Sequence, residues 1–427
     1  MPQPEPPPPE SPPPQLPFPE LPPLESPSPG SPSPGQRPPG RQPRASRPAR
    51  LLFIDNLRWV LVILVISMHA ADTYSPLGNW YFVDRVPLTT PVVLFFAAWQ
   101  MFLQAFFMGL LFFIAGVFVP ASFDEKGPQR FLLERARRLG LPVLFYMLVL
   151  GPVTEYFFAH SWTSTQPTSF AHEWLKHIRN GEFLQENGPL WFCLALLIFS
   201  LGYVAIRVLD PALRKYRPRT GGARPPPRLR AMICFAVIMA AATFLVRLGR
   251  PAPVLNMHLG DLPQYILLFS AGIWAARQGW LPHFSFKQGV LWLALATTLG
   301  IVVWLAIIVV GGALTGNADT YAGGWHWQSA ALDSWESLTC VGVCLGLLVL
   351  FRDKLDLQGR IGRFAAKNAF SVYVFHPPIL IGIARLLHGV AWHPLIRFAI
   401  LASSATVVAF VASAVVFRRT PLLRAIL

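Results

Sequence analysis

The feature that most constrains this chain is the series of long apolar segments that follows residue 50. A membrane-spanning helix needs about 20 mainly apolar residues, and ten segments of roughly that length can be placed after residue 50. Only 13% of the residues are charged, whereas soluble globular proteins carry about 25%. The sequence therefore predicts an all-α polytopic membrane protein and excludes a soluble enzyme.

The ten predicted spans lie near residues 51–71, 93–119, 139–158, 189–208, 231–248, 263–279, 288–310, 328–351, 367–387 and 394–417. Prolines and glycines are expected to mark most of the boundaries, because proline cannot donate a helical hydrogen bond. The prolines assigned to boundaries are Pro120, Pro189, Pro211, Pro263 and Pro282.

The basic residues predict the orientation of these spans. With the N-terminus in the cytoplasm, cytoplasmic segments carry 28 Lys and Arg residues and external loops carry 6. Such an imbalance follows the positive-inside rule and predicts ten spans with both termini cytoplasmic, in an inner or plasma-type membrane. The net charge of +15 could indicate nucleic-acid binding, but the basic residues lie between apolar segments. That pattern favours the lipid bilayer, and no nucleic acid, as the partner.

Residues 1–50 differ in composition from the rest of the chain. They hold 21 of the 43 prolines, with many Ser, Gly, Gln, Glu and Arg residues. Such a segment has little apolar surface to bury, which predicts a disordered tail. No apolar region of a cleavable signal lies near Met1, so the first span is expected to act as an uncleaved anchor. The predicted domains are thus a tail, 1–50, and a transmembrane domain, 51–427.

Arg58 and His69 are the first candidates for function, because ionisable groups inside a bilayer are costly. They lie eleven residues apart in the first span, which puts them on one helix face roughly 16 Å apart along the axis. The alternative is structural: Arg58 pairs with Asp55, and His69 makes an interfacial hydrogen bond. Asp72 is the nearest carboxylate after His69 and could be its partner.

His376 lies in the middle of the ninth predicted span and is followed by Pro377 and Pro378. The two prolines remove backbone donors and are expected to kink the helix. The carbonyls that they leave unpaired suit a polar cavity in which His376 takes part. Equally, His376 could simply cap those carbonyls.

Other charged residues of the spans allow two interpretations each. Glu155, Asp333 and Glu336 are expected near the outer ends of their spans, where they orient a histidine or face interfacial water. Arg135 and Arg138 precede the third span, where they bind an anionic headgroup or a nucleotide phosphate, or only enforce topology.

Cysteine usage indicates neither disulfides nor a metal site. The four cysteines fall inside apolar runs and show no metal-ligand spacing, so we expect small buried apolar residues and no metal. They are Cys193, Cys234, Cys340 and Cys344.

Several segments together resemble one known family. Ile54 to Arg58, followed by His69, resembles the opening signature of the integral-membrane acyltransferase type 3 family. Four further segments agree in order: Phe112 to Phe118, with Ala115 where serine is usual; Phe131 to Pro142; Leu190 to Phe192; and Ser371 to Pro377. The branch that it most resembles includes glucan succinyl-transfer proteins.

The resemblance implies a membrane O-acyltransferase. Such an enzyme moves a short acyl group, acetyl or succinyl, from cytoplasmic acyl-CoA to a hydroxyl of a glycan or other extracytoplasmic acceptor. The family's essential Arg and His correspond to Arg58 and His69, and Ala115 argues against a serine nucleophile at that position.

The candidate roles follow from the chemistry of these groups. His69 is expected to act as general base, or to form an acyl-histidine, assisted by Asp72, Glu155 and His376. Arg58, with Arg135 and Arg138, is expected to bind the donor, since guanidinium groups suit phosphates. Two other classes stay open: a transporter or flippase that uses the same polar stripe, and a non-catalytic membrane sensor.

Overall fold

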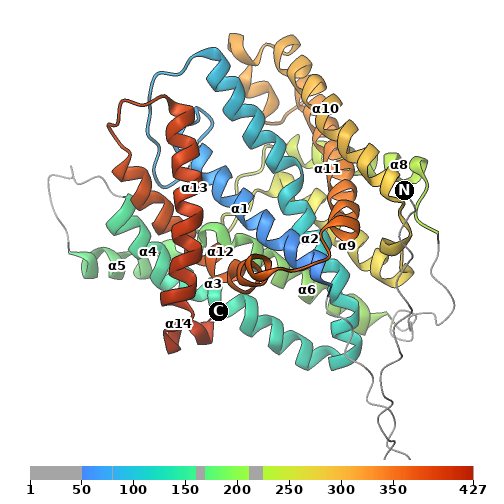
Figure 1. Cartoon of the computed structure of the whole chain (residues 1–427), viewed down its shortest axis with the longest axis horizontal. Coiled ribbons are helices and arrows are strands. Elements are labelled where there is room, and N and C mark those ends of the chain that lie inside the picture. Colours follow the sequence, from blue (N-terminus) through green and yellow to red (C-terminus); the bar gives the residue numbers. More distant parts are fainter. Residues whose placement is uncertain (1–50, 79, 160–168, 211–224, 427) are drawn as a thin grey trace, which may run out of the picture. The chain divides into compact units, whose positions relative to one another are not determined.

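The computed structural model of the chain describes residues 51–78, 80–159, 169–210 and 225–426. The tail predicted to be disordered, residues 1–50, and the predicted boundary at Pro211 lie outside the described residues. The described residues are mostly helical (Figure 1), and they contain no β-sheet, only an isolated bridge between Val254 and Met257. The predicted all-α class is confirmed.

The chain begins with two long helices, which are joined by the loop 75–89. The longer helices of the described chain are α1 (Leu52–Tyr74), α2 (Thr90–Arg135), α5 (Phe170–Arg179), α6 (Trp191–Leu209), α8 (Leu229–Arg247), α9 (Leu262–Gln278), α10 (Phe286–Val310), α11 (Trp327–Lys354), α12 (Arg360–Leu386) and α13 (Pro394–Ala412). Three short helices accompany them: α3 (Leu141–Phe145), α4 (Gly151–Thr154) and α14 (Pro421–Ile426).

By length and composition, 8 helical segments of the described chain are suited to cross a membrane. Two features separate this number from the predicted ten. Thr90–Ala159 forms a single helical segment of 70 residues that contains both the second and the third predicted spans. The helix α9, which corresponds to the sixth predicted span, has only 17 residues. A polytopic membrane protein is therefore confirmed, whereas the number of spans and the side of each terminus stay predictions.

Proline marks the helix boundaries less strictly than predicted. Pro263 lies at the start of α9 and Pro189 just before α6, as expected. Pro120, however, lies inside α2, so the prediction that it ends the second span is wrong. Proline removes one hydrogen bond but keeps a helical φ, so a packed helix can continue through it. The backbone instead leaves helical geometry at Gly127 (φ 74°, ψ 170°), a conformation that glycine adopts readily.

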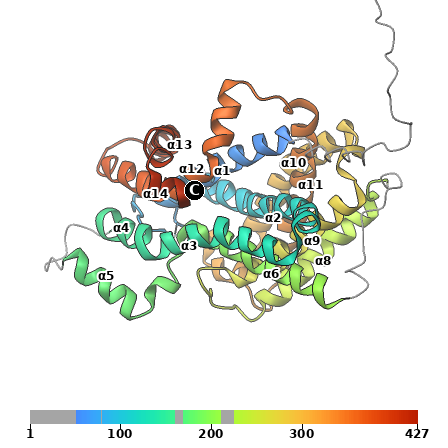
Figure 2. The ribbon, with the colours of Figure 1, turned by 90° about the horizontal axis from the view of Figure 1, so that it is seen from below.

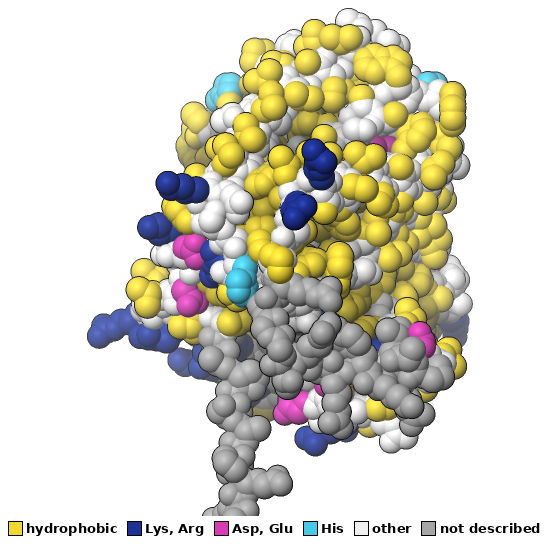
Figure 3. Space-filling model, turned by 90° about the vertical axis from the view of Figure 1, so that its right-hand side faces the viewer, with side chains coloured by type: hydrophobic (Ala, Val, Ile, Leu, Met, Phe, Trp, Pro, Cys, Tyr) yellow, Lys and Arg dark blue, Asp and Glu magenta, His cyan; other side chains and the backbone are white. Residues whose placement is uncertain are grey.

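The first helix joins parts of the chain that lie far apart in the sequence. α1 packs against α2, α11, α12 and α13, and Figures 1 and 2 show it beside these helices. α10 is peripheral, because only 17% of the residues in its apolar 18-residue stretch are buried. The corresponding share in α11 is 72%. One face of the molecule is covered mainly by apolar side chains (Figure 3), as contact with lipid requires.

Peripheral position also explains one wrong prediction. Cys193, Cys340 and Cys344 are buried, as expected, but Cys234 is exposed. Cys234 lies on α8, and only 22% of the residues in the apolar stretch of this helix are buried. An apolar run in a membrane protein thus does not distinguish a core position from one that faces the lipid.

Glycine allows two helices to approach each other closely. α2 and α9 pack along most of the length of α9, with Gly116 on one helix and Gly272 on the other. A methyl group added at Gly272 would overlap the carbonyl oxygen of Phe113, and one at Gly116 would overlap that of Phe269. The absence of a side chain at both positions therefore sets the distance between the two helices.

We expect the substitution Gly272→Ala to lower the free energy of unfolding by about 1–3 kcal/mol, because the added methyl must push backbone apart. The matched control is Gly202→Ala in α6, where a methyl meets no atom within 4 Å and helix propensity improves. Thermal unfolding of both variants in detergent checks this expectation. Equal losses at the two positions would contradict it.

Candidate functional site

A polar cavity of about 840 Å³ lies between the helices of the membrane domain. Its walls come from α1, α2, α6, α8, α9, α11 and α12 and from the loops that connect them. Two of the residues predicted to be functional, His69 and Asp72, line it. The cavity is therefore the place where the predicted chemistry can be examined.

His69 and Asp72 form a hydrogen-bonded pair on the cavity wall. They lie three residues apart on α1, and His69 Nδ1 is 3.0 Å from Asp72 Oδ2. Gln100 of α2 is buried and donates from Nε2 to the other carboxylate oxygen over 2.5 Å. An ionised Asp72 only accepts hydrogen bonds, so His69 donates to it from Nδ1, and in the neutral imidazole Nε2 then has the lone pair. Such a histidine can accept a proton from a molecule in the cavity.

Aromatic rings fix the plane of the His69 imidazole. Trp80, from the loop between α1 and α2, stacks on it with centroids 4.2 Å apart and planes 10° from parallel. His376 of α12 also stacks on it, with a centroid distance of 5.4 Å and an interplanar angle of 17°. Side-chain stacking and the Asp72 contact together leave the ring little freedom to rotate.

His376 caps a carbonyl that proline leaves unpaired. Its Nδ1 donates to the carbonyl oxygen of Tyr373 over 2.8 Å, the oxygen that the nitrogen of residue 377 would bond in a regular helix. The helix α12 continues through Pro377 and Pro378. His376 is 1% exposed and lies behind His69, not on the cavity wall. The capping interpretation describes this contact.

A second charged group lines the cavity around Arg247, at the end of α8. Its guanidinium donates to Asp261 and Asp333, and to Glu336 Oε2 over 3.1 Å. Asp333 is 1% exposed, so the alternative that it faces interfacial water is wrong, whereas Glu336 lies on the cavity wall. They do not orient a histidine either, because a cation from another helix binds them. Buried charges need such partners.

The predicted catalytic residue Glu155 lies beside the cavity and not on its wall. It neighbours Glu186, which does line the cavity from the loop before α6. Burial and the nearby Glu155 carboxyl raise the pKa of Glu186 to about 8. The raised pKa favours the protonated form of Glu186, which can donate a hydrogen bond into the cavity.

The three arginines predicted to bind a donor come together outside this cavity. Arg58 lies over the Phe118 ring at 5.0 Å, and one of its guanidinium nitrogens is 3.5 Å from Asp55. Arg135 lies within electrostatic range of both Arg58 and Arg138. Arg58 of the first span and the segment 135–138 therefore lie near each other, and they form a positive group from residues far apart in sequence.

Sequence analysis missed several residues of the cavity, chiefly Arg247, Gln100, Trp80 and Glu186. A signal existed for Arg247, because two carboxylates three residues apart inside one span require a cation. Gln100 carried no such signal, since it is neutral and lies on another helix. The described residues contain no group of three or more His, Cys, Asp or Glu side chains arranged to hold a metal ion.

Comparison with known families agrees with this geometry. The model of the type 3 family, described as an acyltransferase domain, matches residues 51–414. The match covers most of the chain, so the protein belongs to the integral-membrane acyltransferase type 3 family, as its motifs indicated. Among proteins with curated descriptions, none matches the chain.

We expect Arg247→Met to lower the free energy of unfolding by about 3–5 kcal/mol, because it leaves three buried carboxylates without their cation. Thermal unfolding in detergent measures the loss. Adding Asp333→Asn and Glu336→Gln to the same chain should recover part of it, because the uncompensated negative charge is then reduced. If the triple variant is no more stable than Arg247→Met, charge compensation does not explain this cluster.

Proposed function

We propose that this protein is a membrane O-acyltransferase that moves an acetyl or succinyl group from cytoplasmic acyl-CoA to a hydroxyl of a glycan or other extracytoplasmic acceptor. One observation carries the proposal: a histidine oriented by a carboxylate, His69 with Asp72, faces an 840 Å³ cavity in a chain of an acyltransferase family. The cavity has the size of small-molecule sites.

His69 acts as the general base in this mechanism. Its Nε2 takes the proton of the acceptor hydroxyl while the hydroxyl oxygen attacks the thioester carbonyl carbon. The carbon–sulfur bond breaks, and the proton returns from Nε2 to the thiolate of CoA. Asp72 keeps Nδ1 protonated and stabilises the charged imidazole during transfer. In a variant of this path, Nε2 itself attacks the thioester carbon and the thiolate of CoA leaves, which gives an acyl-histidine. The acceptor hydroxyl oxygen then attacks the acyl carbon, the bond to Nε2 breaks, and the hydroxyl proton passes to the thiolate.

Neighbouring residues assist without touching the reacting atoms. His376 supports the face of the His69 ring against which it stacks. Glu155 acts through Glu186, because its nearby carboxyl favours the protonated form of Glu186. The protonated Glu186 then donates a hydrogen bond to the acceptor.

The donor is bound by the arginine group of Arg58, Arg135 and Arg138. Guanidinium groups form paired hydrogen bonds with phosphate oxygens, and the phosphates of CoA carry several negative charges. Arg58 and His69 lie roughly 16 Å apart along α1, a distance that a pantetheine arm can cover. CoA thus stays at one end of the helix while its thioester reaches His69.

In membrane vesicles, label from acyl-labelled acetyl-CoA or succinyl-CoA should appear in glycan with the wild-type protein and not with His69→Ala, because the base is lost. A suitable control is His283→Ala, since this exposed histidine lies outside the cavity. Transfer that persists in His69→Ala contradicts the proposed base. Movement of an unmodified solute, with no transfer from either donor, would support a transporter instead.

We expect Arg135→Gln and Arg138→Gln each to raise the KM for the acyl-CoA donor about tenfold or more, because each removes a hydrogen bond to a charged phosphate. Arg58→Lys should impair donor binding as well, since lysine keeps the charge but loses the planar fork. Steady-state kinetics at varied donor concentration measure these effects. Arg419→Gln, an exposed arginine near the C-terminus, controls for loss of positive charge. A donor KM unchanged in all three variants would refute the assignment.

A further inference from the structure

A buried ion pair fastens the loop that carries Trp80. Asp84, in the loop 75–89, accepts a hydrogen bond at Oδ2 from Arg397 Nη1 of α13 over 2.8 Å. Both side chains are 4% exposed. The backbone nitrogen of Asp84 donates to the carbonyl oxygen of Thr73 near the end of α1, over 2.7 Å. This single residue thus ties the loop to two helices.

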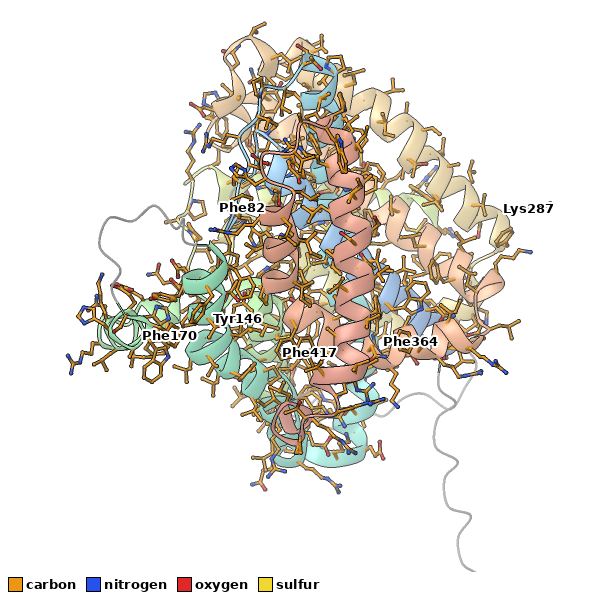
Figure 4. The ribbon with its side chains drawn as sticks, turned by 60° about the vertical axis from the view of Figure 1, so that its left-hand side comes forward. Phe82, Tyr146, Phe170, Lys287, Phe364 and Phe417 are labelled. Atoms are coloured by element: carbon orange, nitrogen blue, oxygen red, sulfur yellow. The ribbon has the colours of Figure 1, made fainter. Side chains whose placement is uncertain are left out.

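Arg397, Asp84 and the nearby Phe82 make further contacts around this ion pair. The Arg397 guanidinium lies 4.9 Å from the centroid of the Tyr74 ring. The other carboxylate oxygen of Asp84 is 3.2 Å from Nδ1 of His388, which is largely exposed. Two residues before Asp84, the ring of Phe82 packs under Arg385 of α12 at 5.3 Å, and Figure 4 shows Phe82 beside the helices at the end of the chain.

These contacts lie outside the cavity, and neither Asp84 nor Arg397 lines it. Their position along the chain gives them a link to the cavity. Trp80, four residues before Asp84, stacks on His69 at 4.2 Å, and the hydroxyl of Tyr81 lies 3.2 Å from that of Tyr146. If the part of the loop around Asp84 moved, Trp80 would move away from the His69 imidazole.

The free-energy cost of burying two charges indicates that the Asp84–Arg397 ion pair does more than stabilise the fold. A buried ion pair is often no more stable than well-packed apolar residues, because both charges lose their hydration. Its hydrogen-bond geometry, however, fixes where the two backbones lie. The pair joins α13, close to the C-terminus, to the loop that follows the first helix, so it sets a position that no local contact determines.

We propose that Asp84 and Arg397 are positioning residues, which hold the loop 75–89 so that Trp80 fixes the orientation of the His69 imidazole. Activity readouts of this role rest on the proposed transferase function, whereas the position of the loop does not. Removal of the pair lowers kcat about 10- to 100-fold, since small displacements of a catalytic group have effects of this size. The KM for the donor stays unchanged, because the arginine group lies elsewhere.

The kinetic test compares Arg397→Gln and Asp84→Asn with Arg397→Lys, which keeps the charge and restores part of kcat. Arg207→Gln is the matched control, because Arg207 is a buried arginine paired with Asp124. In a Trp80→Ala background, Arg397→Gln should cause little further loss if the pair acts through Trp80. Additive losses there, or a kcat unchanged in both single variants, overturn the proposal.

The second test needs no enzymatic activity. A nitroxide spin label is attached at Leu77→Cys in the loop, with the exposed Cys234 replaced by serine. Arg397→Gln or Asp84→Asn should increase the mobility of the label, and Arg207→Gln should not. Unchanged mobility in both pair variants refutes the fastening of the loop. Increased mobility in a protein with no transferase activity would instead refute the proposed function alone. If Arg397→Gln does not fold, the near-isosteric Asp84→Asn decides.

Discussion

The apolar interior of a membrane protein admits a charge only where a partner of opposite charge or a strong hydrogen bond is already in place. The architecture of this chain depends on that constraint. Asp72 meets His69 and Gln100, Arg247 meets three carboxylates, and Asp84 meets Arg397. Each of these groups joins separate parts of the chain or orients a ring on the cavity wall. Polar partners thus fix the position of particular helices and loops, in addition to the close packing that sets the distance between α2 and α9.

The same constraint explains what could be predicted from the sequence. The class of fold followed from the apolar segments, because their length and composition are local properties. The contact between His69 and Asp72 was also local, since three residues along a helix bring two side chains to one face. In contrast, Arg247, the partner of Asp333 and Glu336, lies on another helix, and spacing in one sequence carries no information about such distances.

The predicted helix end at Pro120 and the predicted burial of Cys234 were wrong for a related reason. Pro120 has the local signature of a helix end, yet the helix continues through it because its neighbours in the fold, on α9 and other helices, hold it in place. Cys234 has the local signature of a core residue, yet it is exposed on a peripheral helix. Local chemistry predicts that a residue is apolar or breaks a hydrogen bond, but tertiary packing decides the consequence.

The distribution of charge also bears on how a donor and an acceptor could share one site. Arg247 is the only Lys or Arg among the described residues that line the cavity, and Asp261, Asp333 and Glu336 together outweigh its charge. The arginines at 58, 135 and 138 gather elsewhere. This distribution supports the proposed binding of an acyl-CoA donor, because a group with several phosphates is attracted to the arginine group and repelled from the cavity. In that proposal the phosphates stay with the arginines, and only the arm that carries the thioester reaches His69.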